Sequence, residues 1–110
     1  MDIIENLKTL LAQGQDNSVL HFSLGNAYLN EKKYPQAIKH FSRTLELNPE
    51  YSAAWKLYGK ALAGNSQIDE AIIVYEKGIS VAEKKGDIQA AKEMKVFLKR
   101  LKKQQVEGSR

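Results

Sequence analysis

Apolar residues recur along the chain with the spacing of helix faces. Between residues 18 and 28 they stand at intervals of four and three, which places them on one side of an α-helix: Leu20, Leu24, Ala27 and Tyr28. A second apolar stripe follows a short charged interruption and comprises Ala37, Ile38, Phe41, Thr44 and Leu45. The pattern therefore predicts two consecutive amphipathic helices in the first half of the chain.

Residues that begin or end helices lie at the ends of these stripes. Ser18 is a candidate N-cap for the first helix, and Pro35 suits the first turn of the second, where its missing N–H group costs nothing. Asn48-Pro49 is expected to end the second helix, because a residue before proline disfavours helical geometry. The first unit is therefore helix, turn, helix over residues 18–50.

The same unit recurs 34 residues further along the chain. Matching residues at this spacing include Gly25 and Gly59, Ala37 and Ala71, and Phe41 and Tyr75. The second unit covers residues 52–85 and has Gly64-Asn65-Ser66 as its turn. A period of 34 residues indicates a repeat made of two helices.

Two glycines fall in the middle of predicted helices, where glycine costs about 1 kcal/mol relative to alanine. They are Gly25 and Gly59. A sequence tolerates that cost where another helix must approach closely, and we expect Phe41 and Tyr75 to fill the space between the units. Gly78 predicts a further crowded crossing.

These residues resemble the signature of the tetratricopeptide repeat. The first unit carries Leu24-Gly25, Tyr28, Ala37, Phe41 and Pro49, and the second carries Trp55, Gly59, Ala71 and Tyr75. The chain departs from the signature at His21, Leu62 and Glu83, where the family prefers Trp, Tyr and Pro. The resemblance covers residues 18–85 and implies an all-α fold, a short right-handed superhelix (solenoid) of two repeats.

Two further helices are expected to flank the repeats. Residues 2–14 would form an N-terminal helix with Ile3, Leu7 and Leu10 in the register of a repeat's second helix. Residues 87–103 would form a capping helix that begins at Asp87 as N-cap. The apolar stripe of this cap is Ile88, Ala91, Met94, Phe97, Leu98 and Leu101. We expect residues 1–104 to be a single domain and residues 105–110 to be a flexible tail.

Composition and charge refine this picture in two ways. The chain has no cysteine, so neither disulfides nor thiolate metal sites hold it together, and it has neither a signal-peptide pattern nor a membrane-spanning apolar run. We expect a cytoplasmic protein. The net charge of +4 originates in residues 84–103, which hold eight basic and two acidic residues. A solvated outer face on the cap is the simplest reading of this basic segment.

No motif in the sequence indicates catalysis, a cofactor or a metal site. The two histidines, His21 and His40, stand in different helices without a cluster of other ligand residues. We expect His21 to pack where the family has an aromatic residue and His40 to lie at the surface. The glycines form neither a phosphate-binding loop nor a dinucleotide-binding turn.

Helix geometry and the resemblance together predict a partner-binding groove. The face of each first helix that turns away from its neighbour lines a concave surface in the family, where a peptide or helix of a partner protein binds. The residues that this places in the groove are Phe22, Asn26, Asn30, Lys56, Lys60 and Met94. The competing interpretation is that Phe22 packs against the N-terminal helix. We predict a non-catalytic interaction module, an adaptor or scaffold, and the sequence does not identify its partner.

One branch of the family grips acidic C-terminal chaperone peptides with a clamp of lysine and asparagine side chains. Asn26 matches one clamp asparagine, but the other four clamp positions hold Phe22, Leu57, Asp87 and Ala91. That specificity is therefore not expected here.

Two alternative functions remain open from the sequence. The protein could self-associate through its last helix, with Phe97 and Leu101 at a dimer seam, although we expect a monomer. It could instead bind an acidic partner, nucleic acid or an anionic membrane through the basic residues 92–103.

Overall fold

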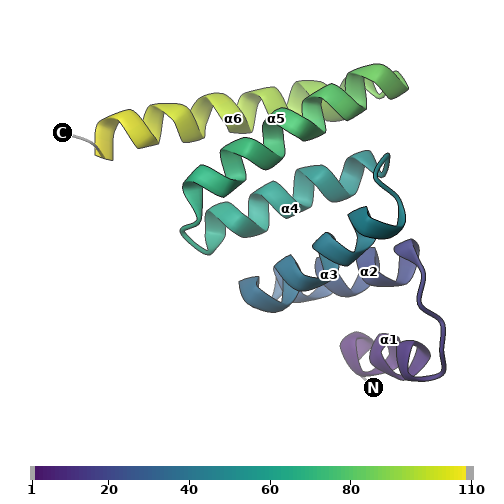
Figure 1. The fold of residues 1–110 in the computed structure, drawn as a ribbon. Coiled ribbons are helices and arrows are strands. Elements are labelled where there is room, and N and C mark those ends of the chain that lie inside the picture. The colour runs from purple at the N-terminus through teal and green to yellow at the C-terminus, as the bar shows by residue number, and fades with distance from the viewer. Residues whose placement is uncertain (1, 109–110) are drawn as a thin grey trace.

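The computed structural model describes residues 2–108, and over that range the chain forms six α-helices and no strand. Their bounds are α1 Ile3–Ala12, α2 Ser18–Asn30, α3 Tyr34–Leu47, α4 Ser52–Gly64, α5 Ile68–Lys85 and α6 Ile88–Gly108. The helices stack in chain order from α1 to α6, and the two termini lie at opposite ends of the stack (Figure 1). This arrangement is the all-α superhelix that the repeat predicts.

Local signals explain where the helices of the first repeat begin and end. The N-cap of α2 is Asn17, whose side-chain oxygen accepts a hydrogen bond from the Leu20 N–H at 2.9 Å. The prediction of Ser18 as the cap was therefore wrong by one residue, since the asparagine amide makes the capping contact. Pro35 stands in the first turn of α3, and that helix ends at Leu47, before Asn48-Pro49.

Each mid-helix glycine lies under an aromatic ring of the second helix of its own repeat. A Cβ atom added at Gly25 would lie 2.7 Å from Cδ1 of the fully buried Phe41. The ring of Tyr75 occupies the same place over Gly59. Gly78 is crowded by Met94 of α6 and by the Cβ atom of Trp55. The crowding expected at these glycines is confirmed, but side chains rather than helix backbones cause it, and Phe41 and Tyr75 each contact the glycine of their own repeat.

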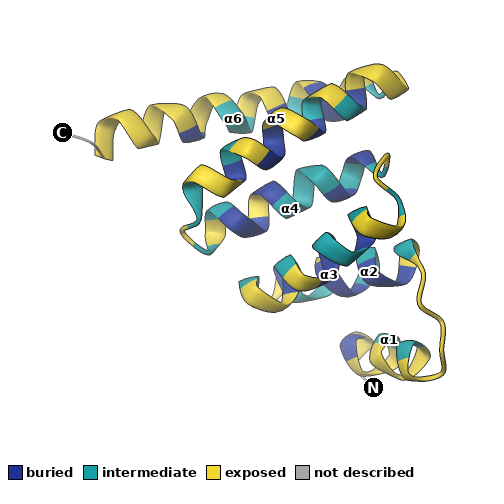
Figure 2. Ribbon diagram, viewed as in Figure 1, coloured by how far each residue is buried: buried dark blue, intermediate teal, exposed yellow. Residues whose placement is uncertain are grey.

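The buried residues form one continuous core along the stack. One cluster centres on Phe41 and Ala61, and the other on Leu62 and Tyr75 together with α6. The partly buried Ile38 and Tyr58 pack against both clusters and join them. Exposed residues gather on the outer side of α6 and over most of α1 (Figure 2).

The N-terminal helix buries a different face from the one expected. Ile4 is 5% exposed, whereas Ile3 is 61% and Leu10 is 36% exposed. The prediction that Ile3, Leu7 and Leu10 would occupy the register of a repeat's second helix was therefore wrong. In α3 that face packs on the preceding helix of its own repeat, whereas α1 turns another side toward the helix that follows it. Helix α1 packs on α2 and turns Ile4 inward instead.

The last helix is longer than the sequence suggested. Asp87 accepts a hydrogen bond from the Ala90 N–H at 3.2 Å, as an N-cap does, but the helix continues past Lys103 to Gly108. No proline or glycine interrupts residues 104–107, and the Gln105 side chain donates to Asp69 at the start of α5. The flexible tail expected at 105–110 is thus helical as far as Gly108, and residues 109 and 110 lie outside the described residues.

Candidate functional site

Three of the predicted groove residues lie together on one face of α2. Phe22, Asn26 and Asn30 follow one another at intervals of four residues, which aligns them along a helix. They line a surface hollow of about 330 Å³. Its other lining residues are Ser23, Ala27 and Glu31 of the same segment and Ile3 of α1. The hollow therefore lies between the beginning of α1 and the length of α2.

The Phe22 ring is covered on one side and open on the other. It stacks on the Tyr51 ring with centroids 4.7 Å apart and lies 6.0 Å from the Phe41 ring. Ile3 lies beside it in the hollow and is largely exposed. Sequence reasoning did not include Ile3, because the repeat register assigned that side chain to the core. Phe22 therefore packs on Tyr51 and Phe41 and also shares a hollow with Ile3 of the N-terminal helix.

A second hollow continues the first toward α4. It is lined by Leu29, Asn30, Lys32, Tyr34, Lys60 and Gly64. Because Asn30 lines both hollows, the two form one surface that runs from Ile3 to Lys60. Lys60 is exposed, and its ammonium group forms no ion pair within residues 2–108. We call the surface formed by Ile3, Phe22, Asn26, Asn30 and Lys60 the α2–α4 surface.

The other predicted groove lysine is already paired. Lys56 Nζ lies 2.7 Å from Glu93 Oε2 of α6, and Gln89 also donates to the Glu93 carboxylate. These hydrogen bonds, that of Lys56 above all, lower the pKa of Glu93. The charge of Lys56 is therefore compensated within the chain, and of the two predicted groove lysines only Lys60 forms no ion pair with residues 2–108.

Met94 does not belong to the groove. Its side chain is fully buried against Gly78, so the prediction that placed it at the concave surface was wrong. The reason lies in α5, which continues one helical turn past Val81, the counterpart of Leu47. The 34-residue register therefore ends before α6, and this helix turns Met94 toward the core.

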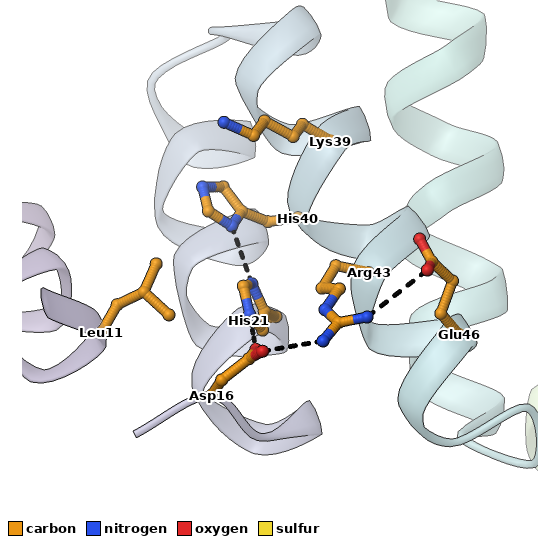
Figure 3. A pocket seen from close by; sticks show the side chains of 7 residues that line it. All are labelled: Leu11, Asp16, His21, Lys39, His40, Arg43 and Glu46. Atoms are coloured by element: carbon orange, nitrogen blue, oxygen red, sulfur yellow. Dashed lines mark hydrogen bonds and ion pairs between the residues drawn. The ribbon is translucent and has the colours of Figure 1, made fainter. Parts of the chain in front are cut away.

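The two histidines meet in the interior of the first repeat. His21 is 6% and His40 is 9% exposed, and their Nδ1 atoms are 3.0 Å apart (Figure 3). His21 takes the place of an aromatic residue, as expected, but the prediction of a surface position for His40 was wrong. His40 precedes Phe41 on α3, and its ring is held between His21 and the Tyr28 ring, 5.7 Å away.

A chain of polar contacts extends from this pair to the surface. His21 Nε2 lies 2.6 Å from Asp16 Oδ1, and Asp16 Oδ2 lies 2.7 Å from a guanidinium nitrogen of Arg43. Arg43 also contacts Glu46, and Leu11 of α1 lines the same hollow (Figure 3). The hydrogen bonds from Arg43 and then His21 lower the pKa of Asp16. Burial, with smaller contributions from His21 and Lys39, lowers the pKa of His40 to about 4.

The described part of the chain contains neither a candidate metal cluster nor a helix that could span a membrane. Within residues 2–108, no group of three or more His, Cys, Asp or Glu side chains is placed to hold a metal ion. None of the helices over the same range is long and apolar enough to cross a bilayer.

Comparisons with known sequences agree with the repeat. A family model described as tetratricopeptide repeat matches residues 18–51. A TPR repeat-containing protein of Pseudomonas aeruginosa is 43% identical over 99 residues, which cover 90% of this chain and 94% of that protein. A heat shock protein sti1 homolog of Schizosaccharomyces pombe is 33% identical over 63 residues, which are 57% of this chain and 11% of that protein.

Comparisons with solved structures agree with the fold. The solution structure of a Bordetella parapertussis protein superposes with a TM-score of 0.85 at 39% identity, covering 94% of this chain and 90% of that one. The TPR domain of Sgt2 from Aspergillus fumigatus has a TM-score of 0.82 at 24% identity, covering 96% of this chain and 68% of that one, and it supports the fold alone. Given the 34-residue period, the glycines under aromatic rings and these relatives, the chain belongs to the tetratricopeptide-repeat family.

Proposed function

We propose that the protein is a non-catalytic adaptor that binds a short segment of a partner protein along the α2–α4 surface. Proteins of this family commonly mediate protein–protein interactions. The proposal rests mainly on Asn30, which lines both hollows. The predicted groove positions on α2 and α4 therefore lie on one surface. The proposal includes the cytoplasmic location expected from the sequence.

The chemistry of this surface suits an extended peptide. Ile3 and Phe22 offer an apolar contact at one end, and Lys60 offers a cation at the other. Between them the Asn26 and Asn30 amides can both donate to and accept from a peptide backbone. A segment with one apolar anchor and an acidic residue or carboxylate further along would match these groups. Phe22 occupies a position where the chaperone-peptide clamp uses lysine, which separates this surface from that specificity.

The test compares a variant of the α2–α4 surface with a charge-reversal control on another helix. A partner is first identified by affinity purification with the wild-type protein, and its dissociation constant is then measured with purified components. We expect N26A/N30A/K60E to weaken binding at least tenfold, because it removes the two amides and reverses the charge that would contact the peptide. The three side chains are exposed and contribute no core packing, so the fold should be unchanged. The control Lys77→Glu reverses an exposed charge on α5 and should bind as wild type. Equal affinity of all three proteins would place the binding site elsewhere.

A second candidate function rests on α6. Lys92, Lys99, Arg100 and Lys103 lie along one stripe of that helix and form no ion pair within the described chain, whereas Lys95 and Lys102 pair with Glu83 and Glu76. Val96, in the same stripe, is 49% exposed. This face would suit an acidic protein or nucleic acid. Charge reversal of Lys99, Arg100 and Lys103 should abolish such binding, and nucleic-acid affinity should fall steeply with salt. Binding that survives charge reversal would exclude the candidate.

Self-association through α6 has less support. Leu101 is buried, and the Phe97 ring packs on Tyr75 with centroids 5.9 Å apart. Both residues of the proposed dimer seam are therefore used within one chain. Sedimentation over a concentration series tests what remains of this alternative, and we expect a monomer at every concentration.

A further inference from the structure

The contact between the two histidines has the geometry of a direct hydrogen bond between ring nitrogens. The ring centroids are 5.3 Å apart and the planes differ by 26°. The centroid distance is about the sum of the 3.0 Å Nδ1–Nδ1 separation and the two ring radii. The two nitrogens therefore point at one another in nearly coplanar rings (Figure 3). Lone pairs in this arrangement oppose each other and do not converge on a shared metal ion.

Counting protons shows what this contact allows. Asp16 as a carboxylate only accepts, so His21 Nε2 carries a hydrogen and donates it. When both rings are neutral, His40 Nδ1–H donates to the bare Nδ1 atom of His21. One added proton is accommodated, because His40 Nε2 lies on the far side of its ring from His21 (Figure 3). A second added proton would place an N–H on both Nδ1 atoms, and two donors cannot remain 3.0 Å apart.

We propose that the His21–His40 contact is an acid-sensitive connection between α2 and α3, which holds while the two Nδ1 atoms share one proton and separates when both are protonated. This connection affects the stability of the first repeat whether or not the α2–α4 surface binds a peptide.

Charged and titratable groups approach the pair from every element packed against it. Asp16, from the α1–α2 linker, accepts a hydrogen bond from His21 and is shared with Arg43 of α3, which also contacts Glu46. Lys39 of α3 and Lys8 of α1 line a hollow with His40, and the charge of Lys39 opposes a charge on His40. The Tyr28 hydroxyphenyl ring of α2 stacks on His40 and leaves it little room to move.

Burial, and after it the charges of His21 and Lys39, lowers the pKa of His40 to about 4, so the folded pair resists even the first added proton, for which His40 Nε2 has room. In the unfolded chain a histidine has a pKa of about 6.5, so below that pH the unfolded state binds a proton that folded His40 does not. The contribution of the pair is fully present above about pH 6.5 and is lost as the pH falls through about 4. Acid therefore favours opening of the first repeat.

The second repeat provides an internal control. The residues 34 positions after His21 and His40 are Trp55 and Val74, which do not titrate. Acid should therefore loosen α2 and α3 while α4 and α5 respond only to effects shared by the whole chain.

Hydrogen exchange of the backbone amides tests the proposal at pH 6.5 and pH 5, after correction for intrinsic exchange rates. We expect the opening equilibrium of α2 and α3 in the wild-type protein to rise roughly tenfold more than that of α4 and α5. The variant H21W/H40V carries the residues of the second repeat and should lose this difference. A difference that persists in the variant, or equal responses of both repeats in the wild type, would overturn the proposal.

A second variant and a direct probe guard against a double variant that fails to fold. His40→Gln keeps one donor and one acceptor without titrating, and it should also suppress the difference between the repeats. Nitrogen-15 NMR of the wild-type imidazoles should show one protonated and one bare Nδ1 atom at pH 7. Two protonated Nδ1 atoms at pH 4, together with undisturbed protection of α2 and α3, would contradict the inference.

Discussion

The two repeats share their glycine–aromatic contacts but differ in what fills the space behind them. In the first repeat His21 and His40 meet there and connect through Asp16 to Arg43. In the second repeat the equivalent positions are Trp55 and Val74, and the space is apolar. The fold therefore requires the ring over the glycine, whereas the polarity of the neighbouring positions can vary.

The two repeats also differ in how they contact the flanking helices α1 and α6. The second repeat packs on α6 through a large apolar cluster that includes Met94 and Leu101. The first repeat meets α1 over a small contact, and its polar chain fixes Asp16 in the linker between the two helices. Hydrophobic burial is insensitive to pH, while hydrogen-bonded imidazoles are not. The first repeat is thus the responsive half of the molecule.

The largest effect should follow from placing a histidine in the second repeat. Val74→His would bury a bulky imidazole that has no counterpart of His21 to bond with, since Trp55 stands there. Overpacking and an unsatisfied polar group each cost about 1–3 kcal/mol, so we expect a loss of roughly 2–6 kcal/mol in the free energy of unfolding. Urea denaturation at pH 7 measures it. A loss under about 1 kcal/mol would show that the two sites are interchangeable.

A smaller effect should come from filling the space under the aromatic rings. Gly59→Ala gains helix propensity but drives a methyl group into the Tyr75 ring, and overpacking of this kind costs about 1–3 kcal/mol. Gly25→Ala should cost a similar amount against Phe41. Gly108→Ala, which meets nothing within 4 Å, is the matched control and should not destabilise. Stabilisation by either buried alanine would contradict the role of the rings.

The smallest effect concerns the outer end of the polar chain. Arg43→Gln removes the strongest influence on Asp16, and the pKa of this carboxyl should rise toward its usual value of 3.8. Carbon-13 NMR of the side-chain carboxyl follows the titration directly. Glu46→Gln serves as the control, because it leaves the contact between Arg43 and Asp16 in place. An unchanged titration of Asp16 in the arginine variant would show that His21 alone sets its ionisation.

The sequence predicted those features that depend on spacing within a repeat. The helices of both repeats and the crowding at Gly25 and Gly59 follow from the 34-residue period, whereas Gly64 of the predicted turn Gly64-Asn65-Ser66 belongs to α4. Prediction from the sequence failed for α1 and α6, where the 34-residue register of the repeats does not continue. The extra turn of α5 rotates α6 and buries Met94, and α1 packs on α2 through Ile4, which leaves Ile3 exposed.

The candidate site was accordingly predicted in part. The alignment of Phe22, Asn26 and Asn30 required only the helical repeat of α2, and the hollow that they line contains all three. The pairing of Lys56 with Glu93 and the burial of His40 depend on how separate helices meet, which a single sequence does not encode locally. An aspartate five residues before a histidine at an aromatic position was the available signal for the polar chain.

The shallow seating of α1 has a consequence for binding kinetics. Only Ile4 of that helix is buried, so α1 should detach and return many times while the repeats stay folded. Ile3 belongs to the hollow beside Phe22, so the apolar end of the α2–α4 surface is complete only while α1 is packed on α2. A ligand that contacts Ile3 would therefore also fasten the N-terminal helix, and part of its binding energy would be spent on lengthening the lifetime of that seated state.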